Sequence, residues 1–173
     1  MSGRGSAPRT LLVDTDLFFY YLRGGSLEGQ AEEVVDGAEA GRFVLRTSSE
    51  VYDDAILALR SDEYPLDGIR EFLGDMRSIP HSPVPMSAQV AAEAVALYME
   101  FGGRGRLSYF DSFHVATAKS LDLVFLTSDG YIVRNALKLG VRASDLAKWR
   151  PGGVGDAAKG APEGPGWSDP GRA

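Results

Sequence analysis

The sequence predicts an α/β protein, a three-layer α/β/α sandwich around a central, mostly parallel sheet. Short apolar runs of strand length occur at residues 10–13, 42–47 and 123–126. Segments with apolar residues at helical spacing separate these runs, and such alternation is typical of parallel sheets with right-handed crossovers. We expect one domain over residues 10–149, a flexible arm at 1–9 and a Gly/Pro-rich, disordered tail at 150–173.

The strands are expected where the chain is apolar over a few residues. Residues 10–13 and 123–126 are apolar almost throughout, which suits strands that are buried on both faces. Residues 42–47 (RFVLRT) form the second expected strand in chain order. Residues 79–85 hold three prolines, which leaves an edge strand or an extended connector. A short final strand is expected at 141–143.

The helices are expected from apolar spacing and from capping residues at their ends. Ser26 and Ser87 are candidate N-caps, and Ser48 or Ser49 is the candidate for the helix that begins near Glu50. The expected helices cover residues 17–22, 27–40, a segment from about residue 50, 66–77, a segment from Ser87 to about residue 100, 109–121 and 131–139.

Composition limits the classes of protein that the chain can belong to. The 173 residues are 44% apolar and 24% charged, which is ordinary for one globular domain. The absence of cysteine excludes disulfides and thiolate metal sites, and it fits a reducing cytosol. No apolar run approaches the ~20 residues that span a bilayer, and the N-terminus lacks the apolar region of a secretory signal. We expect a soluble cytoplasmic protein with no membrane contact.

Four acids stand at strand ends or helix starts: Asp14, Glu50, Asp111 and Asp129. A parallel sheet brings the carboxyl ends of its strands to one edge, where open α/β sheets place their ligands. Buried carboxylates that meet there require positive charge, and oxygen-rich sites suit Mg²⁺ or Mn²⁺. The structural alternative is that each acid caps a helix, occupies a turn or interacts with a helix dipole.

Other polar residues lie close to these acids in the sequence. Asp54 is four residues after Glu50, so the two side chains can lie on the same face of a helix. Asp54 is then either a second metal ligand or part of a solvated acidic face. His114 either flanks the pocket or is a packed helix residue. The complete second group is Asp16, Thr15, Thr127, Ser128, Asp54 and His114. The net charge of −6 disfavours nucleic-acid binding unless bound cations offset it.

Three stretches resemble the PIN-domain family, particularly its VapC-type toxin ribonucleases: LLVDTDLFFYYL, TSSEVYDDAILAL and YFDSFHVATAKSLDLVFLTSDGYI. The resemblance covers residues 10–146, and DSFHVATA at 111–118 is its most specific part. The four acids named above fall on the family's four acidic positions. The resemblance implies a parallel five-stranded sheet and Mg²⁺- or Mn²⁺-dependent cleavage of single-stranded RNA. It also implies frequent homodimers and a cognate antitoxin. Asp16 departs from the family, which commonly has Asn or Ser there, and adds negative charge.

The leading hypothesis is therefore a metal-dependent endoribonuclease, the toxin of a VapBC-type pair. The alternatives are a PIN nuclease of RNA processing that is not a toxin, and a PIN-like scaffold that binds RNA or protein without cleaving. A haloacid-dehalogenase-like phosphatase, with Asp14 of the Asp14-Thr15-Asp16 triplet as nucleophile, is disfavoured. That family needs a downstream lysine and a paired-acid motif, and Lys119 precedes Asp129 in the wrong setting.

Overall fold

The computed structural model describes residues 8–150. Residues 151–173 of the expected tail and residues 1–7 of the expected arm lie outside the described residues. Arg9 already belongs to the first strand, β1 (Arg9–Val13). Trp149, near the expected end of the domain, is only 2% exposed and packs edge-on against Phe43 at a centroid distance of 5.4 Å.

The core of the fold is a five-stranded sheet in the order β3-β2-β1-β4-β5. Every neighbouring pair of strands is parallel, so the expected mostly parallel, five-stranded sheet is confirmed. Proline-containing β3 lies at one edge, where a missing backbone donor is tolerated. The other strands are β2 (Phe43–Ser48), β3 (Ser82–Val84), β4 (Val124–Thr127) and β5 (Arg142–Asp145).

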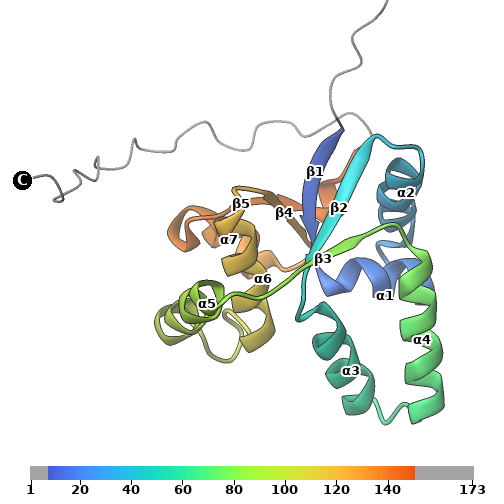
Figure 1. Cartoon of the computed structure of the whole chain (residues 1–173), viewed down its shortest axis with the longest axis horizontal. Coiled ribbons are helices and arrows are strands. Elements are labelled where there is room, and N and C mark those ends of the chain that lie inside the picture. Colours follow the sequence, from blue (N-terminus) through green and yellow to red (C-terminus); the bar gives the residue numbers. More distant parts are fainter. Residues whose placement is uncertain (1–7, 151–173) are drawn as a thin grey trace, which may run out of the picture.

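Helices cover both faces of the sheet, as Figure 1 shows, which confirms the three-layer sandwich. Helices α1 (Thr15–Arg23) and α2 (Glu28–Glu39) cover one face, and α3 (Val51–Ser61) and α4 (Leu66–Ser78) pack against α1. The opposite face carries α5 (Ala88–Phe101), α6 (Tyr109–Ser120) and α7 (Gly130–Leu139). A single turn, η1 (Leu146–Lys148), follows β5.

The central strand β1 is buried on both faces, as its apolar sequence predicts. Leu11 and Val13 belong to the core beneath α1 and α2, whereas Leu12 belongs to the core with α5, α6 and α7. This alternation follows from the two-residue period of a strand. The strand therefore delivers the next residue, Asp14, to a position between two dry layers.

Several expected helix starts are wrong at the level of single residues. Ser26 does not cap α2, because the N-cap is Leu27 and it makes no side-chain capping bond. Neither Ser48 nor Ser49 caps α3: Ser48 remains in β2, and the N-cap is Glu50. Ser87 does cap α5 by accepting a hydrogen bond from Val90 N, as expected.

Helix α6 is the most deeply buried helix, and this explains why its sequence lacks a clear polar face. It packs on α5, on α3 and on strands β2 and β4. All seven residues from Ser112 to Ala118 are buried, including polar Ser112, His114 and Thr117. Within residues 8–150, no helix combines the length and the apolar character needed to cross a membrane.

Candidate functional site

The candidate site lies where β1 and β4 end side by side. The chain leaves β1 towards β2 on one side and reaches β4 on the other, so the strand order reverses between β1 and β4. Ligands of open α/β sheets bind at the carboxyl ends of strands beside such a switch point. Asp14 follows β1 directly, and Ser128 and Asp129 follow β4.

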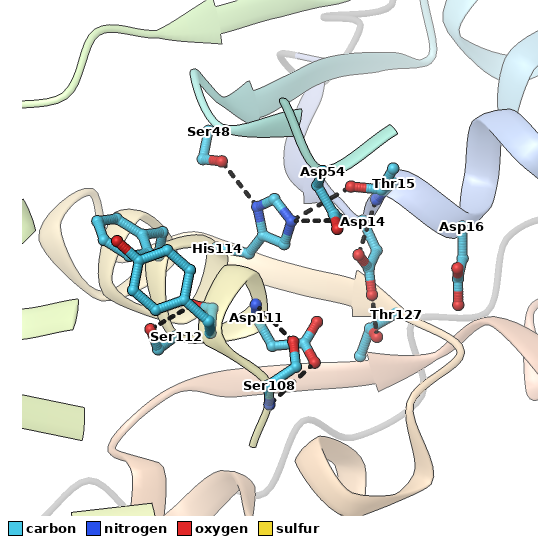
Figure 2. A network of polar contacts seen from close by, with 12 residues as sticks. Asp14, Thr15, Asp16, Ser48, Asp54, Ser108, Asp111, Ser112, His114 and Thr127 are labelled. Atoms are coloured by element: carbon cyan, nitrogen blue, oxygen red, sulfur yellow. Dashed lines mark hydrogen bonds and ion pairs between the residues drawn. The ribbon is translucent and has the colours of Figure 1, made fainter. Parts of the chain in front are cut away.

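Asp14 is the most buried acid of the candidate site, with 5% of its surface exposed. Its Oδ1 accepts a hydrogen bond from Thr15 N over 2.7 Å, which makes Asp14 the N-cap of α1. Its Oδ2 accepts a hydrogen bond from Thr127 Oγ1 over 2.5 Å, across the two strands. Figure 2 shows the carboxylate pointing towards Thr127. Asp14 therefore caps a helix, which is the structural role considered for it above. Its hydrogen bond from Thr127 is a second contact that capping does not require.

The Asp14 carboxylate lies in surroundings that disfavour its charge. Burial, the largest cause, and the nearby charges of Asp111 and Asp16 raise its pKa to about 8, although His114 and the Thr127 hydrogen bond act in the opposite direction. A carboxyl group with this pKa holds a proton at neutral pH unless a cation replaces the proton. Such a shift at the carboxyl edge of a parallel sheet marks a candidate functional residue.

Asp111 lies in the first turn of α6, where it forms a capping box with Ser108. Asp111 N donates to Ser108 Oγ over 3.1 Å, and Ser108 N donates to Asp111 Oδ2 over 3.4 Å. Burial is the main cause that raises the pKa of Asp111, and the charges of Asp129 and Asp54 add to it. In addition to its capping role, Asp111 therefore lies near enough to the acids of α3 and of the α7 N-cap for their charges to raise its pKa.

Asp129 caps α7. Its Oδ1 accepts hydrogen bonds from Tyr131 N over 2.6 Å and from Ile132 N over 3.0 Å. Its backbone N donates to Thr127 Oγ1 over 3.0 Å, so Thr127 connects Asp129 with Asp14. The charges of Asp14, Asp111 and Asp129 thus act on one another in pairs, Asp14 with Asp111 and Asp111 with Asp129.

The remaining sequence-predicted acids lie in two places. Glu50 caps α3 without a side-chain bond to the helix, and its Oε1 accepts a hydrogen bond from Ser49 Oγ over 3.4 Å. Its charge is not among those that shift the pKa of Asp14 or Asp111. Asp16 accepts a hydrogen bond from Ser128 Oγ, so these two residues form a second link between the ends of β1 and β4.

His114 is fully buried and contacts three elements besides its own helix. Its Nδ1 lies 2.7 Å from Ser48 Oγ on β2, and its Nε2 lies 3.2 Å from Thr15 Oγ1 on α1 and 3.4 Å from Asp54 Oδ2 on α3. Burial lowers the pKa of His114, but the Asp54 hydrogen bond and the charges of Asp14, Asp54 and Asp111 raise it to a value above the ordinary 6.5. The charges of Asp14, Asp54 and Asp111 therefore favour the protonated form of the imidazole, whereas its burial favours the neutral form.

The donor chemistry of the site fits a divalent ion that is only partly enclosed by protein. Carboxylate oxygens are the ligands that Mg²⁺ and Mn²⁺ prefer. Burial, and after it neighbouring negative charge, raises the pKa values of Asp14 and Asp111, and a bound cation would offset both effects. Among residues 8–150, no three acidic or histidine side chains are close enough to enclose a metal. The metal site that the sequence predicts from Asp14, Glu50, Asp111 and Asp129 therefore stays a prediction. Mg²⁺ commonly keeps several waters and uses one or two protein carboxylates.

The sequence assigns Ser48 another role and does not single out Arg134. Ser48 is a candidate helix cap by its sequence, but it bonds to His114 across 66 positions of the chain. Arg134 lies over the start of α7: a methyl group at Gly130 would be 2.7 Å from its Nη1. The spacing of four residues between Gly130 and Arg134 could have indicated this contact, because such residues share a helix face. Nothing local in the sequence indicates the partner of Ser48.

Known structures share this fold. VapBC2 from Rickettsia felis, solved bound to a DNA fragment from its promoter, is 12% identical, with a TM-score of 0.60 over 79% of this chain and 98% of that chain. VapBC-1 from nontypeable Haemophilus influenzae is 16% identical, with a TM-score of 0.55 over 80% and 99%. FitAB bound to an IR36 DNA fragment is 17% identical, with a TM-score of 0.50 over 82% and 98%. At these identities the likeness concerns the fold. No curated protein matches the sequence.

The PIN domain family matches residues 11–138, most of the described chain. The match includes Asp14, Asp111 and Asp129, the acids at the ends of β1 and β4 and at the start of α6. This protein belongs to the PIN domain family, whose members are generally nucleases.

Proposed function

We propose that the protein is a Mg²⁺- or Mn²⁺-dependent endoribonuclease that cleaves single-stranded RNA, and that it is the toxin of a VapBC-type pair. The observation that carries the proposal is the Asp14 carboxylate, buried at the switch point of the sheet beside the charge of Asp111. A helix cap alone does not need such a position, because a cap on the protein surface avoids the cost of burying a charge. Burial beside like charges is understandable if a cation binds there.

Asp14, Asp111 and Asp129 would hold the ion, and Glu50 would act as a further ligand or orient a water. A bound divalent ion would supply an acidified water and stabilise charge on the phosphodiester. Thr127 keeps Asp14 oriented, because its hydroxyl donates to Oδ2. Ser128 does the same for Asp16. These hydroxyls leave the carboxylates with free lone pairs for a ligand.

Arg134 would bind a phosphate of the RNA next to the acids. Its guanidinium lies against Gly130, the residue after Asp129, although a cation at a helix N-terminus is disfavoured by the helix dipole. Among the described side chains, none forms an ion pair with Arg134. A phosphate is a suitable partner for this exposed cation, because guanidinium binds phosphate through paired hydrogen bonds.

The likeness to VapBC and FitAB structures supports the toxin assignment and an antitoxin partner. The partner of this chain would be a small cognate antitoxin, and the active species would be a homodimer that acts on RNA in the cytoplasm. A neighbouring reading frame for a small antitoxin, and a complex purified after coexpression with it, would support the assignment. A chain that sediments as a monomer at micromolar concentration would contradict the homodimer.

Cleavage of a single-stranded RNA oligonucleotide with Mn²⁺ tests the nuclease. Asp14→Asn and Asp111→Asn remove one negative charge each while keeping a capping oxygen. We expect each variant to lose about 10²–10³-fold in kcat, the range found when one hydrogen-bond donor to a developing negative charge is removed. The matched control is Asp145→Asn, because Asp145 is also a strand-end acid and caps η1 through Ala147 N. Undiminished cleavage by both site variants would end the proposal.

A non-catalytic PIN-like scaffold is the second candidate, because Asp14, Asp111 and Asp129 all make helix-capping bonds. These bonds would be needed even if the protein bound no metal. Calorimetric titration with Mn²⁺ separates the two functions. The nuclease requires binding that Asp14→Asn weakens, whereas the scaffold requires none.

A further inference from the structure

We propose that His114 is a positioning residue of the candidate metal site, one that sets the separation between Asp14 and Asp111 by tying α6 to α1, β2 and α3. The inference rests on the proposed function, because it concerns the affinity of that site for a divalent ion. It assigns no contact between His114 and the ion.

Both ring nitrogens of His114 are engaged, each with a different part of the fold. Nδ1 meets Ser48 Oγ at 2.7 Å, and Nε2 is shared between Thr15 Oγ1 at 3.2 Å and Asp54 Oδ2 at 3.4 Å. Figure 2 shows the ring between Ser48 on one side and Thr15 and Asp54 on the other. The partners lie on elements that are far apart in the chain, so the His114 ring connects α6 with α1, β2 and α3.

The chemistry of the partners defines the direction of these hydrogen bonds. A carboxylate can only accept, so Nε2 carries the hydrogen that points towards Asp54. In the neutral ring Nδ1 then accepts from the Ser48 hydroxyl, and in the protonated ring it donates to the same oxygen. The contacts therefore persist in both charge states. No aliphatic side chain can replace them.

His114 is connected to Asp111 through their shared helix and to Asp14 through Thr15. Asp111 lies three residues earlier on α6, about one helical turn away. Thr15, which shares Nε2, donates its backbone N–H to Asp14 Oδ1 over 2.7 Å. Movement of α6 relative to α1 would therefore change the Asp14–Asp111 separation, and the His114 contacts oppose that movement.

A packing role alone does not account for a histidine here. The side chain is fully buried, with the ring of Phe125 at a centroid distance of 6.2 Å. A buried polar ring costs free energy unless its nitrogens are hydrogen-bonded. An apolar residue would fill the same volume without needing any hydrogen-bond partners. The acids on three elements also raise the pKa of His114, which agrees with a ring placed among their charges.

The test compares Mn²⁺ affinity, measured by calorimetry, in folded variants. His114→Leu should weaken Mn²⁺ binding at least tenfold, whereas His114→Gln, which keeps a donor towards Asp54 and Thr15, should weaken it only a few-fold. The matched control is Thr117→Val, one turn further along α6. Thr117 is 3% exposed and its hydroxyl bonds only within the helix, to Phe113 O over 2.8 Å. It should leave Mn²⁺ affinity unchanged.

A cleavage readout distinguishes positioning from general damage. A positioning role predicts that His114→Gln needs a higher Mn²⁺ concentration for half-maximal cleavage but reaches nearly the same maximal rate. A purely structural role would lower the rate at every Mn²⁺ concentration, and that result would overturn the inference. If His114→Leu does not fold, Ser48→Ala and Asp54→Ala each remove one contact, and wild-type Mn²⁺ affinity in both would also overturn it. Wild-type protein that binds no Mn²⁺ would instead contradict the proposed function itself.

Discussion

Thr127 holds Asp14 from the adjacent strand: its hydroxyl donates to Asp14 Oδ2 over 2.5 Å and accepts a hydrogen bond from Asp129 N over 3.0 Å. One hydroxyl therefore orients the end of β4 and the acid at the end of β1. Its hydrogen bond is also one of the contacts that lower the pKa of Asp14. This contact therefore favours the carboxylate form of Asp14.

Thr127→Val should weaken Mn²⁺ binding about 10- to 100-fold, because a hydrogen bond to a charged group contributes about 1.5–3 kcal/mol. The valine keeps the shape of the side chain but removes the donor, so the pKa of Asp14 rises further and the metal competes with a more tightly held proton. Calorimetric titration with Mn²⁺ measures the change. Thr127→Ser keeps the hydroxyl and should bind as the wild type does; equal affinity of the valine and serine variants would contradict the role of this bond.

The stability of the metal-free protein should fall as the pH rises. The pKa of Asp14 is about 8 in the folded protein against an ordinary value of 3.8, so the folded state holds a proton that the unfolded chain releases. This stabilisation is complete below about pH 4 and is lost as the pH rises towards 8. The raised pKa of His114 acts in the same direction above pH 6.5.

Thermal unfolding in a chelator should therefore give a lower Tm at pH 8.5 than at pH 5.5, by more than the roughly 2–4 °C that corresponds to 1 kcal/mol in a domain of this size. Asp14→Asn should remove most of the decline, whereas Asp53→Asn, an exposed acid on α3, should not. Mn²⁺ should raise the Tm more at pH 8.5 than at pH 5.5. A decline of the same size in Asp14→Asn would contradict the assignment of the pKa.

The fold and the placement of single acids could be predicted from local sequence, but the polar contacts between elements could not. The apolar runs before Asp14 and Asp129 predict buried strands, and a parallel sheet then brings their ends together. The ring of His114 bonds to Ser48 and Thr15, which are 66 and 99 positions away. No periodicity carries that information, because these contacts depend on how α6 packs on the sheet.

Helix starts show a second limit of local patterns. Ser26 has the composition of an N-cap, yet α2 begins after Leu27 without a capping side chain. Ser48 continues β2 for one more residue, because it pairs with Val84 of β3, and its hydroxyl bonds to His114. In both places tertiary packing determines the boundary, whereas the capping preference of serine is worth only about 1 kcal/mol.

Asp16→Asn should lower the pKa of Asp14. Asp16 stands where the family commonly has a neutral residue, and its charge is one of the causes that raise the pKa of Asp14. Asparagine keeps an oxygen that can accept the Ser128 hydrogen bond, so the variant removes charge with little change in contacts. We expect a decrease, because a neighbouring negative charge disfavours the ionised carboxylate. Carboxyl ¹³C shifts followed against pH measure it, and Ser128→Ala, which keeps both charges, is the control. An unchanged pKa in Asp16→Asn would show that Asp16 is screened from Asp14.

Arg134→Gln should weaken the binding of single-stranded RNA and reduce its dependence on salt. For a single strand, each phosphate that is neutralised by a cation contributes about 0.7 to the steepness of log affinity plotted against log salt concentration. Loss of the Arg134 contact should therefore reduce the steepness by about that amount. Gly130→Ala tests the same contact without removing charge, because the new methyl group would displace the guanidinium, whose Nη1 would otherwise be 2.7 Å away. Arg70→Gln, an exposed arginine on α4, is the charge-matched control. Binding measured by fluorescence anisotropy with Asp14→Asn as the background keeps the RNA intact. If the Arg134 and Arg70 variants change the salt slope equally, the cation acts only through net charge, and the contact beside Asp129 has no special part in holding RNA.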